Sequence, residues 1–181
     1  MITLVTGGVR SGKSTHAEGL VPHDAPAGYV APGLVPLAGD EEWTRRVRAH
    51  QARRPRCWTT VESADLAGVV RSATTPLIVD CLGTWVTRLI DDAGAWDAPA
   101  EAAAAVMRAR TDLVTALRLA PVDVVLVTNE VGWGVVPEHR SGRTFRDELG
   151  RVNAAVSAVA DRVHLVVCGR VLDLSGAPVV S

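Results

Sequence analysis

The sequence predicts an α/β fold in which helices flank a mainly parallel β-sheet, formed as one domain by residues 1–181. Short runs of β-branched and other apolar residues alternate with longer segments rich in alanine and arginine. The apolar runs are continuous, as is typical of strands covered on both faces. With 181 residues, 48% of them hydrophobic, the chain is long enough for one sizeable core and short for two.

The individual elements follow from these runs in chain order. We expect strands over residues 2–6, 28–31, 76–80, 122–128 and 162–167. We expect helices over residues 13–20, 41–53, 63–72, 83–92, 99–119 and 141–160. The order of strands and helices is that of a parallel sheet with helical crossovers.

The composition excludes several classes of protein. A formal net charge of -1 disfavours a nucleic-acid-binding domain, which usually carries a basic excess. Cys57, Cys81 and Cys168 are far apart and form no C-x-x-C pair, so neither a disulfide framework nor a zinc site is indicated. No apolar run reaches the roughly 20 residues of a membrane span, and no signal peptide is recognisable. We therefore expect a cytoplasmic enzyme of small molecules with no membrane span.

The clearest motif follows the first predicted strand and precedes the first predicted helix. It fits the phosphate-loop pattern G-x-x-x-x-G-K-[ST] and consists of Gly7, Gly8, Val9, Arg10, Ser11, Gly12, Lys13 and Ser14. Its glycines let backbone N–H groups and the positive end of the following helix converge on phosphates. A glycine-rich turn with a chance G-K-S is the weaker alternative, because strand and helix both stand where the chemistry needs them.

Lys13 is the single lysine among 19 basic residues, and the other eighteen are arginines. An ammonium is a compact point charge that fits between the β- and γ-phosphates, whereas a planar guanidinium does not fill that space in the same way. Ser14 offers a hydroxyl to Mg²⁺. We therefore predict Lys13 as a catalytic residue and Ser14 as a metal ligand.

Asp80 closes the predicted strand 76–80, where a phosphate-loop protein keeps an acidic residue for the Mg²⁺ shell. An aspartate after a strand is often a turn former, and the phosphate loop is what favours the metal role. The N-K-x-D element by which regulatory GTPases select guanine is absent. It needs a lysine, and the single lysine of this chain, Lys13, lies in the phosphate loop. Asn129 and Glu130 follow the strand 122–128 instead, with roles that the sequence leaves open.

His50 lies in a segment that contains six arginines between residues 45 and 56. Nearby cations disfavour the imidazolium form and attract polyphosphate, so a neutral ring could attack phosphorus and form a covalent phosphoramidate. A solvated helix face that ends before Pro55 is the alternative, and charged runs usually are solvated faces. The residues alone leave both interpretations of His50 open.

Four stretches together resemble the bifunctional adenosylcobinamide kinase/adenosylcobinamide-phosphate guanylyltransferase family of cobalamin synthesis. They are GGVRSGKSTHAE at 7–18, RVRAHQARRPRCWTTVE at 46–62, VDCLGTWVTRL at 79–89, and the long block from TNEVGWGVVPEHR to HLVVCG at 128–169. The match covers most of the chain in order. It departs from the family at residues 31–33, where Ala-Pro-Gly replaces Ala-Thr, and in the C-terminal tail.

The resemblance implies a RecA-like phosphate-loop domain. It implies that the protein phosphorylates adenosylcobinamide and then transfers GMP from GTP to adenosylcobinamide phosphate, with GTP and ATP as substrates and Mg²⁺ as cofactor. In the family, the histidine four residues before the R-P pair carries GMP, and here that residue is His50. Glu62 matches the family's T-x-E segment as a nucleotide-site residue. The family also suggests a homo-oligomer, most simply a homotrimer.

Two other functions stay open at this stage. One is a phosphate-loop kinase of another small molecule, which would need no nucleophilic histidine. The other is a non-enzymatic nucleotide-dependent switch or assembly ATPase. The missing N-K-x-D element counts against a guanine-selective switch. His50 is the residue that discriminates among these functions.

Overall fold

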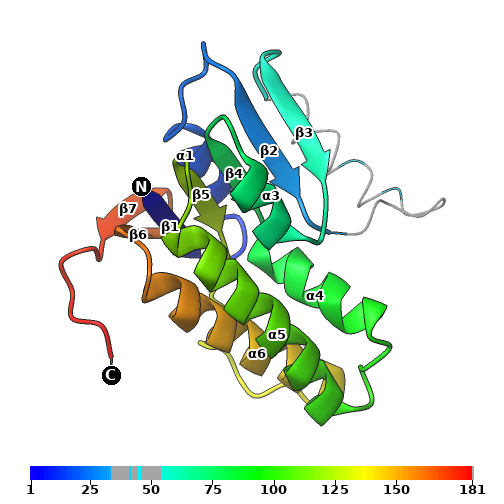
Figure 1. Ribbon diagram of the computed structural model, residues 1–181. Coiled ribbons are helices and arrows are strands. Elements are labelled where there is room, and N and C mark those ends of the chain that lie inside the picture. Colours follow the sequence, from blue (N-terminus) through cyan, green and yellow to red (C-terminus); the bar gives the residue numbers. More distant parts are fainter. Residues whose placement is uncertain (34–40, 42–44, 46–53, 181) are drawn as a thin grey trace.

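A computed structural model describes residues 1–33, 41, 45 and 54–180. Seven strands form one sheet in the order β3-β2-β4-β5-β1-β6-β7 (Figure 1). Their bounds are β1 Ile2–Gly7, β2 Ala27–Ala31, β3 Trp58–Glu62, β4 Leu77–Asp80, β5 Val124–Val127, β6 Arg162–Val167 and β7 Arg170–Asp173. All neighbouring strands are parallel except the pair β6 and β7. The predicted mainly parallel α/β fold is confirmed.

The strands predicted from continuous apolar runs occupy the interior of the sheet. Every residue of β1 and β5 is buried, as expected for central parallel strands. In the register, Leu4 lies beside Leu126 of β5 and Val163 of β6. The carboxyl-terminal ends of β4, β5 and β1 therefore lie side by side. In open parallel sheets, ligands bind outside these carboxyl-terminal ends of the strands.

The helices lie on both faces of the sheet but not equally. Their bounds are α1 Lys13–Glu18, α3 Leu66–Ser72, α4 Leu82–Asp92, α5 Pro99–Arg118 and α6 Arg140–Ser157. Helices α3 to α6 lie together on one face, and α1 packs against the other (Figure 1). The predicted helix 41–53 falls almost entirely outside the described residues.

Two hydrophobic clusters correspond to the two faces. The larger joins one face of the central strands to α3, α4, α5 and α6, with Trp85 and Leu126 fully buried in it. The smaller joins the opposite side chains of the same strands to α1, with Tyr29 and Ile78 at its centre. Alternate residues of one strand thus serve different clusters, because successive side chains of a strand point to opposite faces.

Strands β3 and β7 were not predicted, and both form edges of the sheet. In β3, Thr59, Thr60 and Glu62 are exposed, so the strand has no continuous apolar run. In β7 every residue is exposed, and the strand is joined to β6 by a turn with Cys168 and Gly169 at positive φ. A strand with one partner buries fewer side chains, so its composition does not reveal it.

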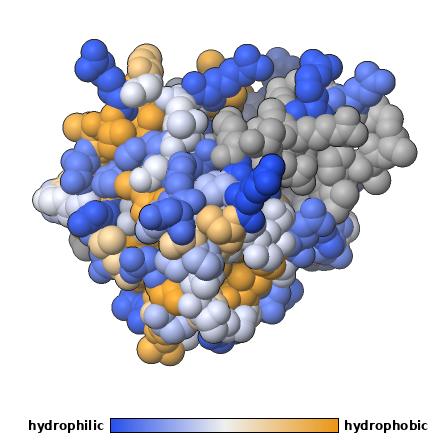
Figure 2. Space-filling model, turned by 90° about the horizontal axis from the view of Figure 1, so that it is seen from above, coloured by the Kyte–Doolittle hydropathy of each residue, from blue (hydrophilic) through white to orange (hydrophobic). Residues whose placement is uncertain are grey.

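The surface is mixed in character. Figure 2 shows hydrophobic residues in separate groups among hydrophilic ones on the face that it presents. Within the described part of the chain, no helix is long and apolar enough to cross a membrane.

Candidate functional site

The turn after β1 has backbone conformations that require glycine. Gly7 and Gly12 have φ values of 151° and 99°. A Cβ on Gly7 would lie 2.3 Å from the carbonyl oxygen of Val166, so no larger residue fits there. Arg10, with φ of 57°, completes the tight loop. The segment predicted as a phosphate loop therefore adopts a compact turn directly between β1 and α1.

In the part of the chain that the structure describes, no side chain caps the backbone donors in the first turn of α1. Gly12 is the N-cap residue and provides no side-chain acceptor for them. The hydroxyl oxygen of Ser11 is buried and has no hydrogen-bond partner among the described residues. Unpaired N–H groups and a buried hydroxyl around one turn suit a phosphate group, which accepts several hydrogen bonds at once.

Lys13 begins α1 and folds back over the loop. Its Nζ donates a hydrogen bond to the carbonyl oxygen of Gly8 at 3.1 Å. Partial burial lowers the pKa of Lys13, and the nearby Cys81 and Asp80 oppose this effect. The ammonium is therefore held in a partly desolvated position, where its attraction to a phosphate is stronger than in bulk water.

Asp80 ends β4, two strands from β1, with β5 between them. The hydroxyl of Tyr29 in β2 donates a hydrogen bond to Asp80 Oδ2 at 2.7 Å. Burial raises the pKa of Tyr29, and Asp80 raises it further, so the phenol stays protonated and keeps donating. The guanidinium carbon of Arg54 lies 3.5 Å from the centre of the Tyr29 ring. Tyr29, with Arg54 over its ring, thus contacts Asp80 from the side of β2.

Ser14 and Asp80, the two residues predicted to hold Mg²⁺, carry oxygen atoms of the kind that this ion binds. Ser14 is in the first turn of α1, and Asp80 lies near Lys13, as their electrostatic interaction indicates. No group of three or more His, Cys, Asp or Glu in the described part of the chain could hold a metal ion by itself. Mg²⁺ needs no such group, since it keeps several waters and binds through few carboxylates together with phosphates.

A polar network that the sequence did not predict joins β5 and α6 to the phosphate loop. Thr6 Oγ1 donates to Glu130 Oε1 at 2.8 Å, and the Glu130 backbone N–H donates to the carbonyl of Gly7 at 3.3 Å. Asn153 of α6 donates to the carbonyl of Asn129 at 3.0 Å. Asn129 and Glu130 stood out in the sequence only by following an apolar strand. Their partners are more than twenty residues away.

Comparison with known proteins identifies the family. A family model described as cobinamide kinase / cobinamide phosphate guanyltransferase matches residues 3–174. The chain belongs to this family. The resemblance found in its motifs is thereby confirmed.

Three relatives match the chain over nearly its whole length. The "Bifunctional adenosylcobalamin biosynthesis protein CobU" of Escherichia coli (strain K12) is 40% identical over 179 residues, 93% of this chain and 97% of that protein. The CobU protein of Salmonella typhimurium is 40% identical over 178 residues, with the same shares covered. The CobP protein of Pseudomonas aeruginosa is 38% identical over 185 residues, 98% of this chain and 99% of that protein.

Of the residues predicted for a cobinamide kinase/guanyltransferase site, Glu62 lies in a strand that three others separate from β1 in the sheet. Glu62 ends β3 and Asp80 ends β4, so both lie at the carboxyl-terminal ends of the parallel strands, but β2 lies between their strands. His50 lies outside the described residues. The roles of both stay predictions, as do those of Lys13, Ser14 and Asp80.

A histidine pair lies beside the loop, between α1 and β6. His16 Nε2 is 2.9 Å from His164 Nδ1. Burial lowers the pKa of His16, and His164 lowers it further. One ring donates and the other accepts in this contact, and the tautomers decide which ring does which.

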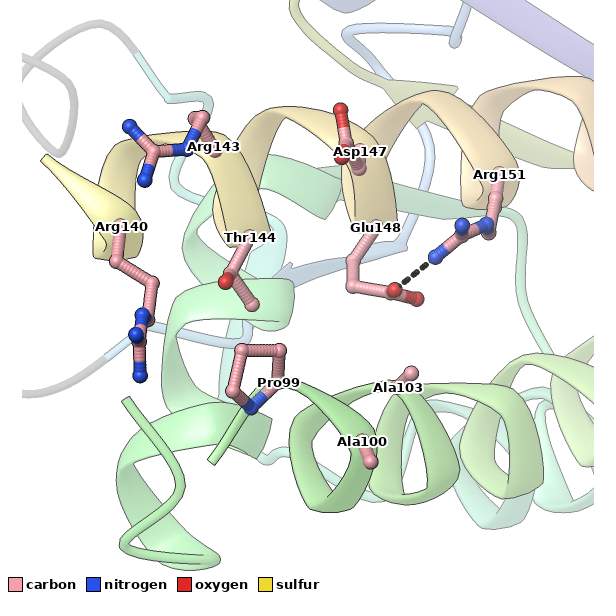
Figure 3. A pocket seen from close by; sticks show the side chains of 9 residues that line it. All are labelled: Pro99, Ala100, Ala103, Arg140, Arg143, Thr144, Asp147, Glu148 and Arg151. Atoms are coloured by element: carbon pink, nitrogen blue, oxygen red, sulfur yellow. Dashed lines mark hydrogen bonds and ion pairs between the residues drawn. The ribbon is translucent and has the colours of Figure 1, made fainter. Parts of the chain in front are cut away.

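A separate pocket of about 480 Å³ lies between the beginnings of α5 and α6 (Figure 3). Its lining combines small residues of α5 with charged residues of α6: Pro99, Ala100, Ala103, Arg140, Arg143, Thr144, Asp147, Glu148 and Arg151. Buried Glu148 pairs with Arg151 there. Arg140 and Arg143 point away from that pair, Arg140 toward the α5 side (Figure 3). None of the phosphate-loop residues lines this pocket.

Proposed function

We propose that this protein phosphorylates adenosylcobinamide and then transfers GMP from GTP to adenosylcobinamide phosphate, giving adenosylcobinamide-GDP. Membership of the cobinamide kinase/guanyltransferase family supports both activities. The observation that carries the proposal is the phosphate loop, in which Lys13 bends over a turn with unpaired donors. A nucleotide is the ligand that such a turn fits best.

In the kinase step, the phosphate loop would bind the β- and γ-phosphates of the donor nucleotide. The hydroxyl of adenosylcobinamide attacks the γ-phosphorus, the bond to the bridging oxygen breaks, and the nucleoside diphosphate leaves. Lys13 would stabilise the charge that builds on the phosphoryl oxygens. Ser14 and Asp80 would hold Mg²⁺, which neutralises phosphate charge when bound.

In the guanylyl step, His50 would act as the nucleophile. A nitrogen of the neutral imidazole forms a bond to the α-phosphorus of GTP, and pyrophosphate leaves. A phosphate oxygen of adenosylcobinamide phosphate then attacks the same phosphorus, and the P–N bond breaks. The support for this assignment is the H-x-x-x-R-P spacing in a family whose reaction includes guanylyl transfer.

The test is covalent labelling with α-labelled GTP and Mg²⁺. Wild-type protein should keep the label through denaturation, lose it in acid and retain it in alkali, because a phosphoramidate P–N bond is labile to acid. His50→Ala should abolish the label and guanylyl transfer, yet leave phosphorylation of adenosylcobinamide at least partly intact. His23→Ala, at an exposed histidine in the segment before β2, is the matched control and should label fully.

The same assay separates the two alternatives. A kinase of another small molecule would show neither label nor turnover of adenosylcobinamide. A switch or assembly ATPase would bind nucleotide without transferring phosphate or GMP to any acceptor. Label that survives acid, or persists in His50→Ala, would remove His50 from the mechanism. Running the kinase assay with γ-labelled ATP and γ-labelled GTP in parallel identifies the phosphate donor.

We also propose the assembly and compartment that the sequence led us to expect. The family resemblance supports a homotrimer, and light scattering of the purified protein would measure the number of subunits. A reducing compartment such as the cytoplasm agrees with Cys57, Cys81 and Cys168, which are free thiols. No nucleic-acid partner is proposed, because the net charge is -1.

A further inference from the structure

Glu130 contacts two consecutive residues at the carboxyl-terminal end of β1, where the phosphate loop begins. The hydroxyl of Thr6 donates to Glu130 Oε1 at 2.8 Å, and the backbone N–H of Glu130 donates to the carbonyl oxygen of Gly7 at 3.3 Å. The strand pairing of β1 with β5 ends earlier, at Val5 and Val127. Glu130 therefore continues the connection between the two strands into the first residue of the phosphate loop.

Helix α6 holds Glu130 in place. The side-chain amide of Asn153 donates to Glu130 Oε1 at 3.4 Å and to the carbonyl oxygen of Asn129 at 3.0 Å. Its Oδ1 accepts a hydrogen bond of 2.6 Å from the hydroxyl of Thr128. Thr128 and Asn153 are both buried, and buried polar networks whose members are satisfied make a structure rigid. The place of Glu130 is thus fixed by the contact between α6 and the segment after β5.

The contact with Glu130 fixes the orientation of the peptide group between Gly7 and Gly8. This peptide group is planar and trans, so the direction of the Gly7 carbonyl also determines the direction of the Gly8 N–H. On its other side Gly7 pairs with Val166 of β6, and a Cβ on Gly7 would lie 2.3 Å from the Val166 carbonyl oxygen. Gly7 is therefore held between β6 and Glu130, and loss of one contact leaves the peptide group with fewer restraints.

Gly8 passes this restraint on to Lys13. The carbonyl oxygen of Gly8 accepts hydrogen bonds from the backbone N–H of Ser11 at 3.3 Å and from Lys13 Nζ at 3.1 Å. A rotation of the peptide group before Gly8 therefore displaces the acceptor of the ammonium group. Glu130 thereby acts on Lys13 through the backbone of the phosphate loop.

We propose that Glu130 is a positioning residue for both transfer reactions, which holds the start of the phosphate loop so that Lys13 lies where phosphate charge develops. This inference rests on the proposed function, in which Lys13 stabilises that charge. Groups that are fixed in advance stabilise developing charge without the cost of reorganisation, and small displacements of them lower the rate. Glu130 supplies this restraint from outside the phosphate-loop motif.

A direct chemical role is the competing interpretation of Glu130. A glutamate at this end of the sheet would then serve as a general base that takes the proton of the attacking hydroxyl. Glu130 Oε1, however, already accepts hydrogen bonds from Thr6 and Asn153, and a carboxylate oxygen has two lone pairs for such bonds. The contacts of the carboxylate therefore favour positioning, and the direct role becomes an outcome of the test.

Asp161 makes the same double contact at the opposite end of β1. Its Oδ2 accepts a hydrogen bond from the backbone N–H of Ile2 at 2.6 Å, and its own backbone N–H donates to the carbonyl oxygen of Ile2 at 2.8 Å. Ile2 is the first residue of β1, whereas Gly7 is its last. Asp161→Ala is therefore the matched control, because it removes an acidic anchor of the same strand at the end away from the phosphate loop.

The experiment measures transfer kinetics and stability of Glu130→Ala, Glu130→Gln and Asp161→Ala beside wild type. Glu130→Ala should lower kcat/KM for the nucleotide by about 10- to 100-fold in both reactions, because a misplacement of about 1 Å can cost about 100-fold. The KM for adenosylcobinamide should stay near the wild-type value. Glu130→Gln should restore most of the rate, because its amide oxygen accepts from Thr6 as the carboxylate does. Asp161→Ala should lower the urea midpoint, as Glu130→Ala does, and leave the kinetics unchanged.

Thr6→Val keeps the test decisive if Glu130→Ala does not fold. It removes the hydroxyl that donates to Glu130 and keeps a β-branched side chain in β1. The same rates should fall, by a smaller factor than in Glu130→Ala, because Asn153 still contacts the carboxylate. Wild-type rates in Thr6→Val would then overturn the inference.

Two other outcomes would overturn the inference while the proposed function stands. If Glu130→Gln is as slow as Glu130→Ala and binds GTP normally, the carboxylate acts directly in the reaction. If Glu130→Ala and Asp161→Ala have equal kinetics, the contact is a structural one only. If wild type itself turns over no adenosylcobinamide, the proposed function fails, and equilibrium binding of GTP tests the inference separately. Glu130→Ala should then bind GTP more weakly than wild type and Asp161→Ala, and equal affinities would overturn the inference.

Discussion

The two faces of the sheet are built for different purposes. Among the described residues, four helices cover one face and bury Trp85, Leu113 and Leu149 completely. On the other face, among the described residues, the short helix α1 packs against a smaller cluster that includes Tyr29. The residues predicted for chemistry, Lys13 and Asp80, adjoin that second cluster.

This difference shows how the fold separates stability from function. The four-helix face removes most apolar area from water and so supplies most of the free energy of folding. The α1 face can then carry an ammonium, a phenol and a carboxylate in partly buried positions that cost stability. Substitutions on the two faces should therefore differ in whether they lower stability or activity, and five changes test that difference.

The largest effect is expected from Lys13→Ala on the α1 face. Loss of the ammonium removes charge stabilisation in both transfers, worth a factor of about 10² to 10³ or more in rate, and it should also abolish GTP binding. Lys13→Arg should not rescue either property, because a planar guanidinium does not fill the space between the β- and γ-phosphates as an ammonium does. The free energy of unfolding, from urea denaturation, should change little in Lys13→Ala. Normal kinetics in either variant would refute the phosphate-loop assignment.

The next largest effect is expected from Trp85→Ala on the four-helix face. Trp85 is 1% exposed, and its indole N–H donates to the carbonyl of Ala64 at 2.8 Å. The cavity and the lost hydrogen bond should lower the free energy of unfolding by about 3–5 kcal/mol. Trp133→Ala is the matched control, with an expected change within about 0.5 kcal/mol because that indole is exposed. Equal destabilisation by both would show that burial does not decide the cost.

Asp80→Asn should act on the metal requirement. If Asp80 holds Mg²⁺, the substitution should raise the Mg²⁺ concentration for half-maximal activity by about 10- to 100-fold, the usual range for groups around a bound metal. Metal-free nucleotide binding should weaken less. A Mg²⁺ titration at fixed GTP, with nucleotide binding measured in chelator, compares the two quantities. Equal losses would give Asp80 a structural role.

Tyr29→Phe should have a smaller effect of the same kind. It removes the hydroxyl that donates to Asp80 but keeps the ring in the smaller cluster. The free energy of unfolding should fall by about 1 kcal/mol for the lost hydrogen bond. The Mg²⁺ requirement should rise, but less than in Asp80→Asn. A larger shift in Tyr29→Phe than in Asp80→Asn would mean that the phenol itself contacts the ligand.

The smallest effect concerns His16 and pH. Its pKa is lowered in the folded protein, chiefly by burial, so the unfolded chain binds a proton first as the pH falls below about 6.5. Wild-type stability should therefore fall between pH 7.5 and 5.5, and His16→Gln should lose less over the same interval. Urea denaturation at both pH values measures this. The same fall in His16→Gln would assign the pH dependence to other groups.

The sequence predicted the parts of the protein that depend on local pattern. The phosphate loop is a contiguous motif, and the structure forms it as a tight turn between a strand and a helix, as expected. The five strands with continuous apolar runs all exist. Asp80 was placed by its position after such a run, and the structure brings it near Lys13.

The sequence could not predict what depends on pairing across the chain. Thr6 meets Glu130 across 124 residues, and Tyr29 meets Asp80 across 51, with no local signal for either contact. The edge strands β3 and β7 were not predicted, because they bury too few side chains to show an apolar pattern in the sequence. The role of His50 remains a prediction, since that residue lies outside the described part of the chain.

The place of β1 in the sheet has a consequence for synthesis of the protein. β1 is made first, yet its two neighbours are β5, at Val124–Val127, and β6, at Arg162–Val167. A nascent chain therefore carries the phosphate-loop sequence without the strands that hold it in shape until β5 and β6 have been made. Pairings so distant in sequence form late, because loop closure must come first. A ribosome-bound or truncated chain that lacks residues beyond about 160 should thus not compete for cellular nucleotide, and the capacity to bind it arises only after β6 has been made.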